Sequence, residues 1–204
     1  MDFSATTDAT LWEALQQGSQ QAFAAIYDRY FQRLYEYGMR LHPDEDLVKD
    51  AIQELFIKLW TNKETLSTSV NPRPYLLVAL RSTIYNRLRP RKNTVVISFD
   101  QEQHDFLANF SAESAYIKKE QLQAQHQQLL HALNQLNARQ KEILYLRFFE
   151  ELDYDSIAAI MNLSVKGAYK LSARALQNMR DILQVSSAVL ITLLTNFRME
   201  MMKS

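Results

Sequence analysis

The sequence predicts an all-α protein made of two small helical domains joined by a linker. Its 204 residues include only three glycines and four prolines, and long stretches repeat apolar side chains at the spacing of an amphipathic helix. β-branched residues alternate with polar ones only over residues 94–98. This length fits one large domain or two small ones. Residues 94–114, which lack a sustained period, are the expected linker and favour two domains.

The first predicted domain, residues 1–93, contains a short helix that begins near Asp8 and three longer helices. The first long helix spans about 20–41 and the second about 44–62, which opens with three acidic residues suited to the positive end of the helix dipole. The third begins at Asn71-Pro72, where proline is tolerated in a first turn, and ends near Leu88. The stripe expected to face the core on the first long helix is rich in aromatic residues: Phe23, Ile26, Tyr27, Tyr30, Phe31, Leu34 and Tyr37.

The second predicted domain, residues 115–184, contains a helix-turn-helix over 139–180. Asp153 stands where an N-cap belongs, before a helix over 154–161. Asn162 tolerates the left-handed conformation of a sharp turn, and Ser164 caps the next helix, which runs to about Leu183. One side of that helix is expected to face the core, through Val165, Ala168, Ala175, Leu176 and Met179. On spacing alone, a structural helical hairpin remains the alternative to DNA binding.

Residues 185–204 form an apolar helical tail. Its stripe comprises Val189, Leu190, Leu193, Leu194, Phe197 and Met201. Packing on the second domain is the first expectation for this stripe. Contact with a partner protein is the alternative.

Charge is unevenly distributed although the formal net charge is zero. Residues 65–99 carry six Lys and Arg and no acid, and residues 162–180 carry four and no acid. Two separated basic segments of this kind are typical of a nucleic-acid-binding protein, because phosphate binding needs clustered cations.

Other features exclude several classes of function. There is no cysteine for a disulfide or thiolate metal site, and the four histidines are scattered. No glycine-rich phosphate loop or paired nucleophile and base is visible. We therefore expect no enzyme, cofactor, metal or small-molecule substrate. The N-terminus lacks the pattern of a signal peptide and the longest apolar run is too short to cross a bilayer, so a cytoplasmic location is expected.

Three segments resemble a known family. Residues 44–60, DEDLVKDAIQELFIKLW, are very similar to the helix of bacterial sigma factors that docks on RNA polymerase. Residues 71–92, with Tyr75-Leu76 and a basic end, resemble the promoter-melting helix of the same domain, called region 2. Residues 136–180 resemble region 4, the sigma domain that recognises the upstream promoter element. Over about residues 23–183, the chain resembles the extracytoplasmic-function (ECF) sigma factors, particularly the forms abundant in Bacteroidetes-like bacteria.

The resemblance implies a sigma factor that binds core RNA polymerase and directs transcription initiation at promoters. It would recognise the upstream and start-proximal elements and stabilise melted DNA. The implied partners are core RNA polymerase, promoter DNA and, by family alone, an anti-sigma factor. The alternative is a helix-turn-helix regulator that acts without polymerase docking, which would leave the order and spacing of the first two similar segments unexplained.

The residues proposed for each contact follow from the residue types and the resemblance together. Candidate polymerase contacts are Asp46, Asp50, Gln53, Glu54, Phe56 and Trp60, and Phe56 fits core packing equally well. Candidates for the melted start-proximal strand, which calls for cations and aromatic faces, are Arg73, Tyr75, Arg81, Ser82, Tyr85, Asn86, Arg87, Arg89, Arg91 and Lys92. Core packing is the equal alternative for Tyr75. Candidates for the upstream duplex are Ser164, Lys166, Tyr169, Lys170, Ala173 and Arg174.

Two departures limit what the resemblance implies. Ser82 stands where many relatives carry Asn, with Asn86 one turn later, so the identity of the flipped base cannot be copied from them. Gly167-Ala168-Tyr169 stands where relatives usually have Thr-Val and a basic residue. The upstream sequence preference of this chain is therefore not predicted.

Overall fold

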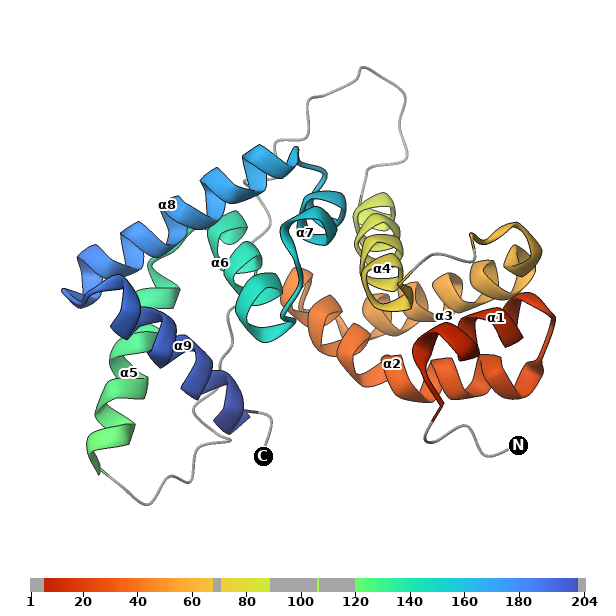
Figure 1. Ribbon diagram of the computed structural model, residues 1–204, viewed down its shortest axis with the longest axis horizontal. Coiled ribbons are helices and arrows are strands. Elements are labelled where there is room, and N and C mark those ends of the chain that lie inside the picture. Colours follow the sequence, from red (N-terminus) through yellow and green to blue (C-terminus); the bar gives the residue numbers. More distant parts are fainter. Residues whose placement is uncertain (1–5, 68–70, 89–105, 107–119, 202–204) are drawn as a thin grey trace. The chain divides into compact units, whose positions relative to one another are not determined.

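The computed structural model describes residues 6–67, 71–88, 106 and 120–201, and the regular elements in these ranges are all helical (Figure 1). The chain divides into two compact units, Met1–Val96 and Ile97–Ser204. Two helical units confirm the predicted fold class. The expected linker, 94–114, lies outside the described residues apart from Phe106.

The first unit contains α1 (Asp8–Gln16), α2 (Gln20–Leu41), α3 (Glu45–Thr61), a 3-10 turn η1 (Lys63–Thr65) and α4 (Pro72–Leu88). The helices begin where side chains cap free backbone N–H groups. Ser19 Oγ accepts from Ala22 N at 3.2 Å, and Asp44 Oδ1 accepts from Leu47 N at 3.0 Å. These local bonds explain why the boundaries of α2 and α3 match the sequence prediction closely.

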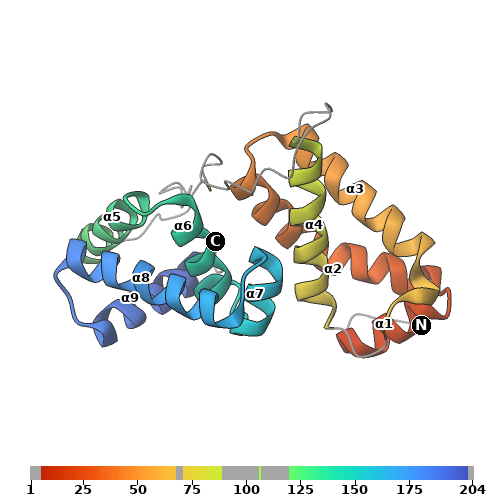
Figure 2. The ribbon, with the colours of Figure 1, turned by 90° about the horizontal axis from the view of Figure 1, so that it is seen from above.

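The core of the first unit forms where α2 packs against α1, α3 and α4, an arrangement visible in Figure 2. Each helix contributes fully or almost fully buried apolar side chains, among them Trp12, Ile26, Leu34, Tyr37, Ile52, Leu55, Leu80 and Ile84. Helices α2 and α3 approach closely at Gly38, where an added Cβ would lie 2.6 Å from Val48 Cγ1. The crossing therefore depends on the missing side chain.

The predicted core stripe of α2 is partly wrong. Ile26, Tyr30, Leu34 and Tyr37 are buried as expected. Tyr27 is 37% exposed, and Phe23 and Phe31 are only partly buried. The apolar arc of α2 is wider than the core it meets, so these rings lie beside α3 at the surface.

The second unit contains α5 (Glu120–Asn134), α6 (Ala138–Leu144), a π-helical turn η4 (Tyr145–Phe149), α7 (Tyr154–Met161), α8 (Val165–Leu183) and α9 (Ser187–Met201). Helix α8 is long and packs against α5, α6, α7 and α9. A capping box starts α6, because Asn137 and Gln140 each accept a hydrogen bond from the other's backbone N–H. Phe106 is also buried here, with its ring 5.8 Å from that of Tyr145, so one residue of the expected linker belongs to this core.

Helix α9 packs on the second unit, in line with the first expectation for the tail. Leu190, Leu194 and Phe197 are buried, and the ring of Phe197 meets Phe149 edge-on at 6.0 Å. Arg198 pairs with Glu151 across the same contact. Val189, which the stripe placed in the core, is exposed.

Candidate functional site

An apolar groove runs between α2 and α3 on the first unit. Its volume is about 800 Å³. The aromatic rings along it contact one another: the ring centres of Tyr27 and Phe56 are 4.8 Å apart, and those of Phe23 and Trp60 are 5.2 Å apart. The lining comes from Gln20, Phe23, Tyr27 and Phe31 on α2 and Lys49, Asp50, Gln53, Phe56, Ile57, Trp60 and Thr61 on α3.

Ile57 is the most exposed large apolar residue of the described chain, with 58% of its surface accessible. It lies on the α3 side of the groove, next to polar Asp50 and Gln53. An exposed apolar centre with a polar rim is typical of a protein-docking surface. Ile57, Phe23, Tyr27 and Phe31 were not predicted as residues of this surface. For Ile57 a usable signal existed, because it is an apolar residue on the polar side of the α3 pattern.

The residues of α3 predicted to contact polymerase are buried to different extents. Asp46, Asp50 and Gln53 are exposed, and Glu54 and Trp60 are partly buried. Phe56 is 3% exposed and lies beneath Phe23 and Tyr27. The burial fits the core alternative, and the ring also forms the floor of the groove, so its contact with polymerase stays a prediction.

Two of these acids pair with a predicted DNA-binding cation. Arg87 on α4 reaches Asp50 at 3.2 Å and Glu54 at 2.9 Å. The hydrogen bond from Lys58, aided by Arg87, holds the pKa of Glu54 below its usual range although partial burial opposes it. Arg87 therefore links α4 to α3 through ion pairs with two acids of α3.

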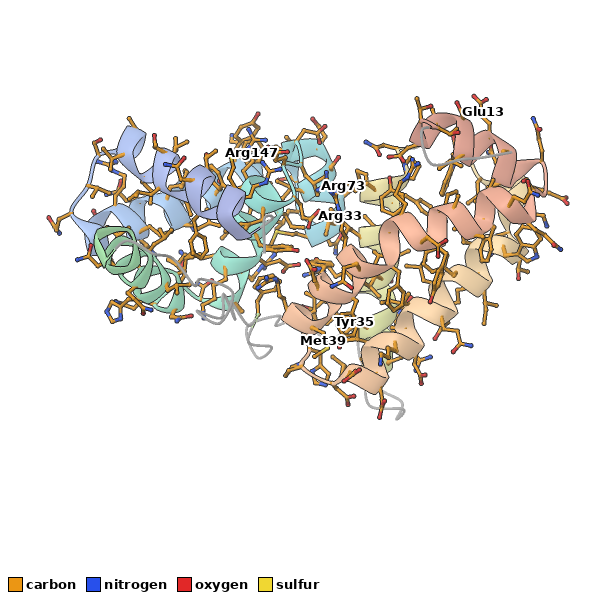
Figure 3. All side chains as sticks on the ribbon, turned by 90° about the horizontal axis from the view of Figure 1, so that it is seen from below. Glu13, Arg33, Tyr35, Met39, Arg73 and Arg147 are labelled. Carbon is orange, nitrogen blue, oxygen red and sulfur yellow. The ribbon has the colours of Figure 1, made fainter. Side chains whose placement is uncertain are left out.

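The outer face of α4 carries polar and aromatic groups but no acid. Ser82 and Asn86 are exposed one turn apart, and Tyr75 and Tyr85 are partly buried. Tyr75 also packs edge-on against buried Trp12, with ring centres 5.4 Å apart, and its contact with DNA stays a prediction. Arg73 projects from the first turn of α4 (Figure 3).

One predicted cation of α4 does not reach the surface. Arg81 is 5% exposed, and its guanidinium carbon lies 4.6 Å from the centre of the Tyr85 ring. Its predicted contact with DNA is corrected: the charge is buried in the unit and supports Tyr85 by a cation–π contact. Arg89, Arg91 and Lys92 lie outside the described residues.

The helix-turn-helix has the local geometry that the sequence predicts. Asp153 accepts a hydrogen bond from Ser156 N at 2.8 Å and caps α7. Asn162 adopts the left-handed conformation, with φ 52° and ψ 54°, and ends α7. Ser164 accepts a bond from Gly167 N at 3.0 Å and caps α8. Asp153 thus sets the start of α7, and Asn162 and Ser164 set the turn into α8.

The first half of α8 presents a basic face to solvent. The exposed side chains at its start are those of the cap residue Ser164 and of Val165, Lys166, Tyr169, Lys170, Ala173 and Arg174. Ala168, Ala175 and Met179 are buried as predicted, and Leu176 is partly buried. Val165 is 38% exposed and leaves the predicted core set, and Ser172, at 0% exposure, takes a core position that the sequence analysis did not assign.

Two residues outside α8 shape this face and were not predicted. The ring of Tyr154 on α7 lies 3.8 Å from that of Tyr169 and is tilted by 31°. The guanidinium of Arg147, labelled in Figure 3, lies 5.2 Å from the centre of the Tyr154 ring. No sequence pattern identified them, because each lies in a different element from α8.

The described residues hold no group of three or more His, Cys, Asp or Glu arranged to bind a metal ion. In the same ranges, no single helix has the length and apolar character to span a membrane, and α8 and α9 meet those criteria only as a pair bent by 97°.

Comparison with known families gives two matches in the order expected. Residues 26–94 match Sigma-70 region 2, and residues 126–179 match Sigma-70, region 4. These ranges contain α3, α4, α7 and most of α8. The α3 side of the groove, the outer face of α4 and the exposed face of α8 therefore lie within segments shared with the Sigma-70 proteins, whereas Gln20 and Phe23 of the groove precede the first of them.

Similar curated proteins are named ECF RNA polymerase sigma factors. SigM of Bacillus subtilis is 23% identical over 157 residues, which cover 77% of this chain and 92% of SigM. SigX of the same species is 20% identical over 172 residues, covering 81% and 86%. SigL of Mycobacterium tuberculosis is 26% identical over 160 residues, covering 75% and 85%.

Two solved structures share the fold. One is CnrH in complex with the cytosolic domain of CnrY, with a TM-score of 0.57 and 17% identity, covering 87% of this chain and 97% of that one. The other is the sigma factor RpoE of Bartonella quintana in complex with the anti-sigma factor NepR, with a TM-score of 0.52 and 20% identity, covering 80% and 98%. Regions 2 and 4 in sequence, the helical fold of both units, and relatives that match over most of their length together show that this chain belongs to the ECF sigma factors, which bind RNA polymerase and direct transcription from promoters.

Proposed function

We propose that the groove between α2 and α3 is the surface with which this chain binds core RNA polymerase. The observation that supports it most directly is the exposure of Ile57 beside a cluster of aromatic rings. Asp50, Gln53 and Trp60 line the groove together with Ile57, and Asp46 and Glu54 are further candidate contacts on the same helix. Acids beside an apolar anchor suit a basic coiled coil of polymerase, because the apolar centre contributes most of the affinity and the charges set the orientation.

The outer face of α4 is proposed to bind the melted strand of the start-proximal element. Tyr75 and Tyr85 offer ring surfaces for unstacked bases, and Ser82 and Asn86 offer hydrogen bonds. Arg73, together with Arg89, Arg91 and Lys92, would contact the phosphates. Arg87 is shared between this role and its ion pairs with α3.

The exposed face of α8 is proposed to enter the major groove of the upstream element. Ser164 and Lys166 lie at the N-terminal end, where a recognition helix approaches the backbone and the base edges. Tyr169, Lys170, Ala173 and Arg174 follow on the same face. Each unit would thus contact a different promoter element.

Finer assignments are part of the proposal. The chain acts without enzymatic activity in the cytoplasm, where polymerase and DNA are found, and belongs with the forms abundant in Bacteroidetes-like bacteria. An anti-sigma factor is a further proposed partner. It is supported by the CnrH complex with the cytosolic domain of CnrY and by the RpoE complex with NepR.

The polymerase assignment is tested by binding of the full chain to core RNA polymerase and by run-off transcription from the DNA upstream of its own gene. Ile57→Glu should weaken polymerase binding by about tenfold or more, since a buried interface centre contributes above about 1.4 kcal/mol. Ile191→Glu on α9 is the matched control, because Ile191 is also exposed, at 44%. Equal binding by the two variants would reject the groove as the docking surface.

The same measurements separate the sigma factor from a regulator that acts alone. A sigma factor must form a stable complex with core polymerase and give promoter-specific transcripts. A regulator would bind duplex DNA without polymerase and would form no complex with core RNA polymerase. That second outcome would overturn the proposed mechanism.

A further inference from the structure

Tyr169 stands out on the proposed DNA-binding face of α8. It is 55% exposed, and it lies one turn after Lys166 and one turn before Ala173. Lys170 and Arg174 follow Tyr169 and Ala173 directly. The face therefore has an apolar line, Tyr169 and Ala173, bordered by cations.

The residue types on this face restrict which bases it can recognise. Residues 165–174 contain no Asn, Gln, Asp or Glu, the side chains that pair best with adenine or cytosine in the major groove. Lys and Arg favour guanine or phosphate. Apolar groups favour the 5-methyl group of thymine, which is the only apolar group that the major groove offers.

The side chain of Tyr169 is held in place by the preceding helix. Its ring lies 3.8 Å from the ring of Tyr154, centre to centre. The Tyr154 hydroxyl donates to Ser172 Oγ at 3.0 Å, and Ser172 is fully buried in α8. Tyr154 is therefore fixed to the same helix that carries Tyr169.

Arg147 supports the stack from η4. Its guanidinium carbon lies 5.2 Å from the Tyr154 ring centre, and its Nη1 donates to Leu152 O at 2.8 Å. A ring that is ordered before DNA binds loses less rotamer freedom on binding. The stack thus gives a rigid apolar contact at the centre of the exposed face.

We propose that Tyr169 and Ala173 recognise thymine methyl groups in the upstream element, and that Tyr154 is a positioning residue for Tyr169. This inference rests on the proposed role of α8 in duplex binding. Beyond that role, it names thymine as the recognised base and gives Tyr154 on α7 a part in recognition without a contact to DNA.

The test uses holoenzyme assembled from the full chain and core polymerase. A duplex library randomised over the upstream element is selected on this complex, and the enriched duplex is then made with uracil in place of each thymine in turn. Uracil lacks only the 5-methyl group. Loss of one methyl contact should weaken binding by about fourfold at one or two positions.

Variants assign the methyl dependence to its residues. At the position that Tyr169 contacts, Tyr169→Ala should bind the thymine and uracil duplexes equally, and so should Tyr154→Ala; a position contacted by Ala173 should keep its methyl dependence in both variants. Tyr154→Phe keeps the ring and should keep the dependence. Lys166→Ala is the control for general DNA affinity, since loss of a phosphate contact weakens both duplexes alike.

The outcomes distinguish this inference from the proposed function. Equal wild-type affinity for every thymine and uracil pair would overturn the inference while leaving upstream recognition intact. Full methyl dependence in Tyr169→Ala would also overturn it. Methyl dependence that survives in Tyr154→Ala at the position contacted by Tyr169 would remove the positioning role. Failure to enrich any sequence would reject α8 as a sequence-specific reader, and the inference with it.

Discussion

Single polar side chains determine where the two helices of the helix-turn-helix begin. Asp153 accepts a hydrogen bond from the backbone N–H of Ser156, and this bond, with a second from the Ser156 hydroxyl, lowers the pKa of its carboxyl. The charged carboxylate is therefore the form that caps α7. Asn162 completes the turn by adopting a conformation that few residues other than glycine tolerate.

Replacement of this cap should weaken α7 in a pH-dependent way. Asp153→Ala should lower the free energy of unfolding of the second unit by about 1 kcal/mol at neutral pH. Because the folded pKa is lowered, the pH-dependent contribution is complete above the usual carboxyl value near 3.8 and is lost as the pH falls through the folded pKa. The urea midpoint of the α7 amide signals in NMR spectra measures this. Asp153→Asn should keep most of the cap but lose the pH dependence; an Asn variant as unstable as Ala would contradict the explanation.

At the scale of elements, close packing of α2 on α3 sets the geometry of the groove. Gly38 allows the two backbones to approach until Val48 fills the space of a missing Cβ. Val48 is fully buried, and a β-branched side chain in a helix has little rotamer freedom to move aside. The distance between the two walls of the groove thus depends on this crossing.

Gly38→Ala should therefore destabilise the first unit although alanine is the better helix former. Overpacking is expected to cost about 1–3 kcal/mol, against a propensity gain of about 1 kcal/mol. Both tryptophans, Trp12 and Trp60, lie in this unit, so their fluorescence during urea unfolding measures the effect. In the double variant with Val48→Ala, the combined loss should be smaller than the sum of the single losses. Additive losses would show that the two sites do not clash.

At the scale of the whole molecule, each unit has its own core and its own role. The core of the second unit includes α9, through Leu190, Leu194 and Phe197. These side chains cover Phe149 and the flank of α8. The tail is thus part of the folded unit that carries the recognition helix.

A chain that ends at Val185 should lose stability in the second unit alone. Removal of three buried apolar side chains should cost at least about 3 kcal/mol. NMR signals of α8 should broaden or shift in urea at lower concentration, while the tryptophan fluorescence transition of the first unit stays unchanged. A parallel shift of both transitions would show that the units unfold together.

Features set by neighbouring residues were predictable from the sequence, whereas features set by the fold were not. The caps at Asp153 and Ser164 and the left-handed Asn162 depend on a few adjacent residues, so local patterns identified them. Tyr27 was expected in the core and is exposed, whereas Arg81 was expected at the surface and is buried. Helical spacing predicts the direction in which a side chain points, but not how much of the helix the neighbouring helices cover. The aromatic tyrosine borders a groove, and the arginine is buried beside Tyr85.

The contact between Tyr154 and Tyr169 affects how this DNA-binding segment could be transferred to another protein. If α8 alone were grafted onto a related scaffold, Tyr169 would arrive without the Tyr154 ring that packs against it. The transferable unit is therefore the pair of helices α7 and α8, together with Arg147. Transfer of the promoter preference proposed for this chain would then require these elements together. Exchange of α8 alone would give a protein with an altered or weakened preference.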